Sequence, residues 1–272
     1  MNKFKYFFGS DARSVPFLES LFNIDKNIKV VTLKPKQQGR GRKLKSNPVE
    51  DFARKNKIDF LYFSDEILLE DFEYGIVASF AKIFNKHFLK NHKNIYNIHL
   101  SLLPELRGPT PVEHTILNNF MHCGYTIFKI DEGVDTGNIL YQHKLDISKE
   151  TYASEVYTKI YNHFKESISL IDFNTKLKKQ SSSVSFTSKF SKNDFDITGL
   201  TLYEAKRNIR AFDVIGPAFI KYFDKFIKIH NYFLDENTPG IELIDGIIYP
   251  KEVTPEGKKR MEFQDYIRGL RW

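Results

Sequence analysis

The sequence is poor in cysteine and contains no long apolar run. Cys123 is the single cysteine, which excludes an internal disulfide and predicts a reducing, cytoplasmic location. No stretch of about 18 apolar residues is present, so no membrane span is expected. The apolar run within residues 1–8 is too short for a secretory signal peptide.

The sequence also lacks the residue spacing of a metal site. Its histidines, its cysteine and its acids form no set with the separations that metal ligands adopt. We therefore expect no metal, and we interpret His114, His122 and Cys123 as surface or core residues.

The composition is that of a globular protein with an excess of basic charge. Its 272 residues are 41% apolar and 28% charged, enough for one large domain or two with a full hydrophobic core. The net charge of +7 favours an anionic partner. Net charge alone does not distinguish RNA from a nucleotide-sugar or from a small anionic ligand.

The first part of the chain predicts an α/β sheet. Residues 4–8 are an apolar strand that ends at Gly9, residues 15–22 are expected to form a helix, and residues 28–33 form a second strand. This order is typical of a Rossmann-like, mostly parallel sheet with helices on both faces. The apolar segment 75–80 is expected to be a central strand.

Two polar loops carry the candidate catalytic residues. Asn97 and His99 end an apolar stretch, and the two-residue period of a strand places them on one face. Asp135 lies in a second loop, 36 residues after His99. An amide, an imidazole and a carboxylate are the groups needed to stabilise an oxyanion and to move protons. Arg107 follows in the first loop, where it either braces the loop or meets an anion.

These two loops resemble the signature of the folate-dependent formyltransferase family. The chain reads Asn-x-His at Asn97, Ser-Leu-Leu-Pro-x-x-Arg-Gly from Ser101, and Asp-x-Gly-x-Asp-Thr-Gly from Asp131. Both parts of the signature match without a gap. The spacing between His99 and Asp135 is also similar to that of the family.

The resemblance implies a co-substrate and a set of site residues. The co-substrate is 10-formyltetrahydrofolate, whose formyl carbon is attacked by an amine. Asn97 is the expected oxyanion donor, His99 assists the oxyanion and the leaving nitrogen, and Asp135 orients His99. The residues expected to contact the folate are Phe80, Ile83, Ser101, Leu102, Asp131, Gly133 and Asp135.

A basic loop follows the second strand. From Lys34 to Ser46 there are six positive charges and no acid, and two glycines make the loop flexible. A charge run is usually a solvated surface. This one resembles an insertion of the methionyl-tRNA formyltransferases that reaches the acceptor arm of the tRNA, so phosphate contacts are expected. The predicted tRNA-binding residues are Arg40, Arg42, Lys43 and Lys45.

The expected domain organisation has three parts. Residues 1–172 are the catalytic domain, 173–185 a basic, serine-rich linker, and 186–272 a small C-terminal domain. The resemblance implies an OB-like barrel for the last part. Compared with the family, this part lacks about one hairpin between Gly240 and Ile247, so a reduced barrel is expected.

The predicted reaction is formylation of the amino group of initiator methionyl-tRNA. One alternative is an N-formyltransferase for a nucleotide-linked amino sugar, which keeps the folate site and replaces the tRNA surface. Formylation of glycinamide ribonucleotide fits less well, because those enzymes usually end before a C-terminal domain. A non-catalytic RNA-binding protein is a further alternative, and the intact Asn97, His99 and Asp135 argue against it. We expect a monomer without a membrane partner.

Overall fold

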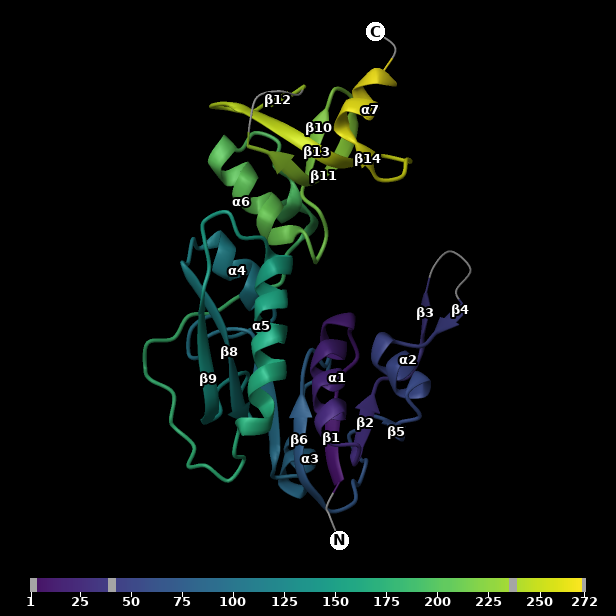
Figure 1. Ribbon diagram of the computed structural model, residues 1–272, viewed down its shortest axis with the longest axis vertical. Coiled ribbons are helices and arrows are strands. Elements are labelled where there is room, and N and C mark those ends of the chain that lie inside the picture. Colours follow the sequence, from purple (N-terminus) through teal and green to yellow (C-terminus); the bar gives the residue numbers. More distant parts are fainter. Residues whose placement is uncertain (1–3, 39–42, 235–238, 271–272) are drawn as a thin grey trace. The chain divides into compact units, whose positions relative to one another are not determined.

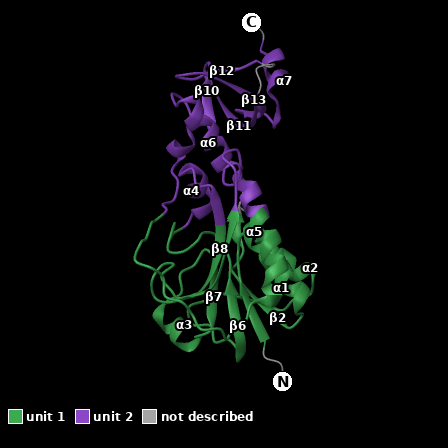
Figure 2. Ribbon diagram, turned by 60° about the vertical axis from the view of Figure 1, so that its left-hand side comes forward, with its two compact units in different colours: residues 1–108, 124–145, 159–186 green, residues 109–123, 146–158, 187–272 purple. Residues whose placement is uncertain are grey.

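The computed structural model describes residues 4–38, 43–234 and 239–270. The chain divides into two compact units (Figure 2). The first comprises residues 1–108, 124–145 and 159–186, and the second comprises residues 109–123, 146–158 and 187–272. Each unit therefore draws on early and late parts of the chain. The division into catalytic domain, linker and C-terminal domain remains a prediction.

The first unit contains a seven-stranded sheet with the order β5-β2-β1-β6-β7-β8-β9. Its strands are β1 Phe4–Phe8, β2 Ile28–Thr32, β5 Phe60–Tyr62, β6 Phe72–Val77, β7 Ile95–His99, β8 His122–Lys129 and β9 Ile139–Asp146. The pairings from β5 to β7 are parallel, and β8 pairs with β7 in the antiparallel direction. In Figure 1, β1 lies between β2 and β6. The predicted mostly parallel sheet is confirmed.

Helices cover both faces of this sheet, as predicted. They are α1 Val15–Ile24, α2 Pro48–Lys55, α3 Lys86–Asn91 and α5 Ala153–Ser167, of which residues 159–167 belong to the first unit. Figure 2 shows α1 and α2 on one side of the sheet and α3 on the other. Helix α2 begins at Pro48 because the side chain of Asn47 accepts hydrogen bonds from the N–H groups of Val49 and Glu50.

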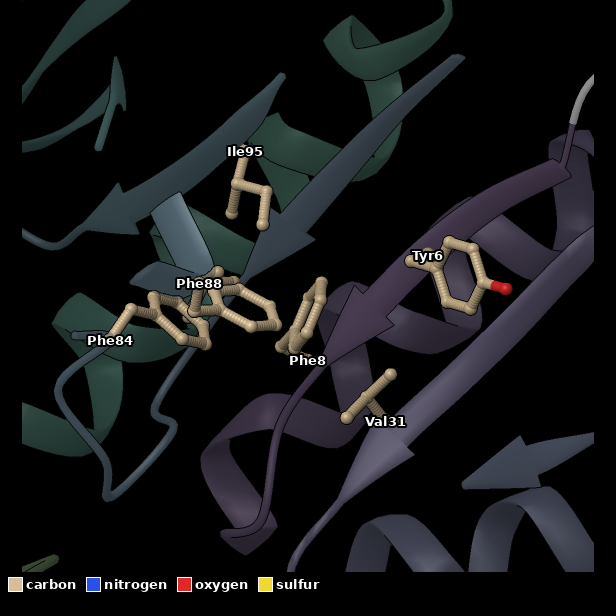
Figure 3. Close-up of a cluster of buried hydrophobic side chains, with 7 residues drawn as sticks. Tyr6, Phe8, Val31, Phe84, Phe88 and Ile95 are labelled. Carbon is tan, nitrogen blue, oxygen red and sulfur yellow. The ribbon is translucent and has the colours of Figure 1, made fainter. Parts of the chain in front are cut away.

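An aromatic cluster lies between the sheet and α3 (Figure 3). Tyr6 and Phe8 point to the same face of β1, since side chains alternate along a strand. The ring of Phe8 meets those of Phe84 and Phe88 edge-on, at centroid distances of 5.4 and 6.2 Å. A fully buried side chain of this size contributes about 1.5–3 kcal/mol through the hydrophobic effect. The cluster therefore anchors the segment that follows β6.

The second unit combines helices with an antiparallel sheet. Its helices are α4 Pro111–Leu117, α6 Leu202–Phe212 and α7 Phe263–Arg268. Its strands are β10 Phe219–Tyr222, β11 Lys225–Phe233, β12 Ile241–Glu242, β13 Ile247–Pro255 and β14 Met261–Glu262. The order is β10-β11-β13-β12, with β14 beside β13. The expectation of a small C-terminal β-sheet is confirmed, and within the described residues no pairing closes it into a barrel.

The basic loop contains an antiparallel hairpin, which the sequence did not predict. Strand β3 Lys36–Gln38 pairs with β4 Lys43–Lys45. Lys43 and Lys45 are exposed on β4. Arg40 and Arg42 lie outside the described residues. The remaining short elements are the 3-10 helices Ala12–Ser14, Ile168–Leu170 and Lys192–Phe195.

Candidate active site

Strand β7 carries Asn97 and His99 to the carboxyl end of the sheet. Asn97 is paired through its backbone with Val77 on β6 and with Phe128 on β8. Its side chain is half-buried, and among the described residues its amide makes no hydrogen bond. Ligands of open parallel sheets bind outside the carboxyl ends of the strands. The Asn97 amide is therefore available to a ligand at this edge.

The imidazole of His99 is held in one orientation. It is 5% exposed, and its Nε2 lies 2.9 Å from the carbonyl oxygen of Leu106. Because a carbonyl only accepts, Nε2 must carry a hydrogen and donate it. The other nitrogen, Nδ1, lies 3.5 Å from Oδ2 of Asp135. Proton exchange at this ring is thus confined to Nδ1, beside the carboxylate.

Asp135 is held in an uncommon backbone conformation. Its φ angle is 54°, in the left-handed region that most residues avoid. Oδ2 of its carboxylate accepts a hydrogen bond of 2.8 Å from the N–H of Gly108. The same oxygen faces the imidazole of His99. The carboxylate therefore connects the loop after β7 with the loop before β9.

Ser101 and Leu102 lie in the loop after β7. The hydroxyl of Ser101 donates to the carbonyl of Glu105 at 2.5 Å, and its own carbonyl accepts from the hydroxyl of Thr126 at 2.7 Å. The half-buried Leu102 is followed by the cis peptide bond between Leu103 and Pro104. The two hydrogen bonds of Ser101 determine the path of the loop that passes His99.

Asp131 and Gly133 belong to the other loop, and they form an exposed turn. Oδ1 of Asp131 accepts from the N–H of Gly133 at 3.1 Å and from the hydroxyl of Thr136 at 2.6 Å. A Cβ atom on Gly133 would lie 2.1 Å from Oγ1 of Thr136, so a side chain at Gly133 would displace Thr136. The turn shapes the approach to Asp135.

Phe80 and Ile83 follow β6, the strand beside β7. The half-buried ring of Phe80 lies 5.4 Å from that of Phe63 and 6.0 Å from that of Phe8. Ile83 is 77% exposed. Because β6 and β7 are parallel neighbours, this segment emerges at the same edge of the sheet as Asn97 and His99.

The site contains one polar residue that the sequence analysis missed. Gln180 accepts hydrogen bonds from the guanidinium of Arg107 and donates two to the loop that carries Asp135. Through Gln180, Arg107 braces the loop that carries Asp135, which is one of the two roles expected for it. No local pattern marks Gln180, because its contacts lie 43 to 73 residues away in sequence.

Among the described residues, no three His, Cys, Asp or Glu side chains form a group that could hold a metal ion. None of their helices is both long and apolar enough to cross a membrane.

Comparison with known proteins identifies the class. A family model described as formyl transferase matches residues 19–172. The chain belongs to the formyl transferase family, which confirms the family that its motifs predicted. Among its relatives, the methionyl-tRNA formyltransferase of Wolbachia pipientis subsp. Culex pipiens (strain wPip) is 31% identical over 97% of this chain and 96% of its own length.

Solved structures share the fold. Methionyl-tRNA formyltransferase from Clostridium thermocellum matches with a TM-score of 0.63 and 15% identity, over 96% of this chain and 99% of its own. An N-formyltransferase from Helicobacter canadensis in complex with folinic acid and dTDP-3-aminofucose matches with a TM-score of 0.62 and 22% identity, over 96% of this chain and 99% of its own. At these identities the likeness is one of fold.

Proposed function

We propose that this protein transfers the formyl group of 10-formyltetrahydrofolate to the amino group of initiator methionyl-tRNA. The observation that supports this most directly is the likeness to methionyl-tRNA formyltransferases along 97% of the chain. Asn97, which lies on the same strand as His99, and the pair of His99 and Asp135 supply the groups that the reaction needs. The folate contacts in this proposal are Phe80, Ile83, Ser101, Leu102, Asp131, Gly133 and Asp135.

In the proposed mechanism the amine nitrogen attacks the formyl carbon. A C–N bond forms, and the carbonyl oxygen becomes an oxyanion that the Asn97 amide stabilises. As the intermediate collapses, the bond to the folate nitrogen breaks and that nitrogen takes a proton from His99. The attacking amine loses its proton to Asp135, directly or through water. Because Nε2 donates to Leu106, protons enter and leave His99 at Nδ1, where Asp135 lies.

The basic hairpin is proposed to contact the tRNA. Lys43 and Lys45 are exposed on β4, where their ammonium groups can reach phosphates. Arg40 and Arg42, which lie outside the described residues, complete the proposed surface. A nucleotide-linked amino sugar carries only a diphosphate, so it would leave a basic arm of this length without a ligand.

A direct competition between acceptors tests the proposal. The purified protein is given 10-formyltetrahydrofolate with methionyl-tRNA in one reaction and dTDP-linked amino sugars in another. We expect formylation of methionyl-tRNA alone, and its abolition by His99→Ala in a matched reaction. Formylation of an amino sugar with higher kcat/KM than methionyl-tRNA would reject the tRNA assignment and support the sugar alternative.

A further inference from the structure

The segment Lys178–Phe186, here called the strap, is bonded to both loops of the site. At one end, the backbone of Lys178 exchanges hydrogen bonds of 2.7 and 2.8 Å with that of Ile139. At the other end, Ser185 Oγ accepts from the N–H of Leu106 at 2.8 Å. These bonds thus join the start of β9 to the loop after β7, two parts of the chain that are distant in sequence.

Gln180 lies within the strap and uses all of its hydrogen-bonding groups. Its Oε1 accepts from Nε and Nη2 of Arg107 at 3.2 and 2.7 Å. Its Nε2 donates to the carbonyl oxygens of Asp135 at 2.9 Å and Gly137 at 2.8 Å. A guanidinium only donates and a carbonyl only accepts, so the orientation of the amide is determined by its partners.

The hydrogen bonds of Gln180 reach Asp135, whose backbone is strained. With φ at 54°, Asp135 occupies a conformation that persists only when its surroundings hold it. Gly108 holds the side chain through its N–H, and Gln180 holds the main-chain carbonyl of the same residue. Without Gln180, two neighbouring carbonyls lose their donor and the peptide from Asp135 to Gly137 can rotate.

We propose that Gln180 is a positioning residue that keeps the carboxylate of Asp135 beside Nδ1 of His99. The inference rests on the proposed function, because it assigns Gln180 an effect through the proposed catalytic carboxylate. A displacement of about 1 Å in a catalytic group can lower the rate on the order of 10²-fold. Gln180→Ala should therefore lower kcat on the order of 10–100-fold and change KM for either substrate by less than about threefold.

A double-mutant cycle with Asp135→Asn distinguishes positioning from general structural damage. If Gln180 acts through Asp135, Gln180→Ala has no further effect on kcat once the carboxylate is gone. Gln180→Glu is the sharper variant, because it keeps an acceptor for Arg107 but cannot donate to the two carbonyls. The exposed Ser182 lies in the same strap, and Ser182→Ala should retain the wild-type kcat.

Hydrogen exchange of the ligand-free protein provides a readout that needs no substrate. In Gln180→Ala and Gln180→Glu, the amides of residues 131–138 should exchange faster, while those of β1 and β6 stay protected as in the wild type. Wild-type kcat in both variants, additive losses in the cycle, or unchanged exchange at 131–138 would each overturn the inference. A wild-type protein that formylates no acceptor would reject the proposed function instead, and the exchange data would still decide the role of Gln180.

Discussion

At the scale of single residues, the site depends on how each side chain is held. His99 is buried, and its Nε2 donates a hydrogen bond to a carbonyl oxygen. The side-chain amide of Asn97 makes no hydrogen bond within the described residues. Asp135 faces His99 from a strained position. Two of these side chains are thus oriented by the fold before any substrate binds, and the third is left for the ligand.

Substitution of any of these three residues should remove most of the turnover and leave the fold intact. Asn97→Ala, His99→Ala and Asp135→Asn are expected to lower kcat on the order of 10²–10³-fold, the usual cost of losing one such group. Asparagine is chosen at position 135 because it tolerates a positive φ better than alanine does. Steady-state kinetics and thermal melting measure the two effects. A variant with near wild-type kcat would remove that residue from the mechanism.

At the scale of elements, the strand that carries the site was predictable and the strap was not. The two-residue period of β7 is a local signal, and it placed Asn97 and His99 on one face at the end of a strand. Gln180 has no such signal, because its partners come from two separate loops. The hairpin that includes Lys43 was missed for a related reason. Its charged residues indicate exposure to solvent, but they do not predict which strand pairs with which.

The basic hairpin makes a measurable prediction about salt. Each neutralised phosphate contributes roughly 0.7–0.9 to the slope of log affinity against log salt. Replacing Arg40, Arg42 and Lys43 together by Ala should flatten this slope by about two units and raise KM for tRNA. The effect on kcat should be far smaller than that of His99→Ala, because these contacts bind substrate and transition state alike. An unchanged slope and KM would show the hairpin to be a solvated surface only.

A stacked pair of histidines, His143 on β9 and His163 on α5, predicts a loss of stability in acid. The rings of His143 and His163 lie 3.4 Å apart, and Nδ1 of His163 lies 3.1 Å from the hydroxyl of Tyr125. Burial, and then the charge of His143, lower the pKa of His163. Because of this lower pKa, the folded state disfavours the charged form of His163. The stability that neutral His163 contributes is present above the unfolded pKa of about 6.5, and it is lost as the pH falls from there through the lower folded pKa.

Replacement of His163 tests this account. In the wild type, the free energy of unfolding should fall between about pH 7.5 and 5.5. In His163→Gln it should fall by less, as measured by urea denaturation. The exposed His87 serves as a control, and His87→Gln should leave the pH dependence as it is in the wild type. Equal pH dependence in wild type and His163→Gln would contradict the assignment.

At the scale of the whole molecule, the two compact units are interleaved along the chain. Within the second unit, Ser154 donates to the carboxylate of Asp213, and the ring of His114 stacks on that of Phe190 at 4.9 Å. Residues that precede the predicted boundary at 186 therefore have partners that follow it. Sequence composition located a boundary at the serine-rich stretch, but it carries no information about such pairings.

Truncation after Phe186 should lower the stability of the protein but leave its folate binding intact. The shortened chain loses the partners of Ser154 and His114, so its melting temperature should be lower than that of the full chain. It retains every residue proposed to contact folate, so folate affinity should persist at low temperature while tRNA affinity falls. Separately expressed residues 187–272, added back, serve as the control and should raise the melting temperature again. A full loss of folate affinity in the folded truncation would reject the predicted boundary.

The position of Gln180 in the chain also has a consequence for synthesis. A ribosome delivers the amino end first, at about 5–20 residues per second, and domains begin to fold as they emerge. Asn97, His99 and Asp135 are all delivered before the amide of Gln180, which bonds the carbonyl of Asp135. A nascent chain that ends before the strap therefore holds the three proposed catalytic side chains without this bond. Under the positioning role proposed for Gln180, full activity is acquired only after the strap leaves the exit tunnel.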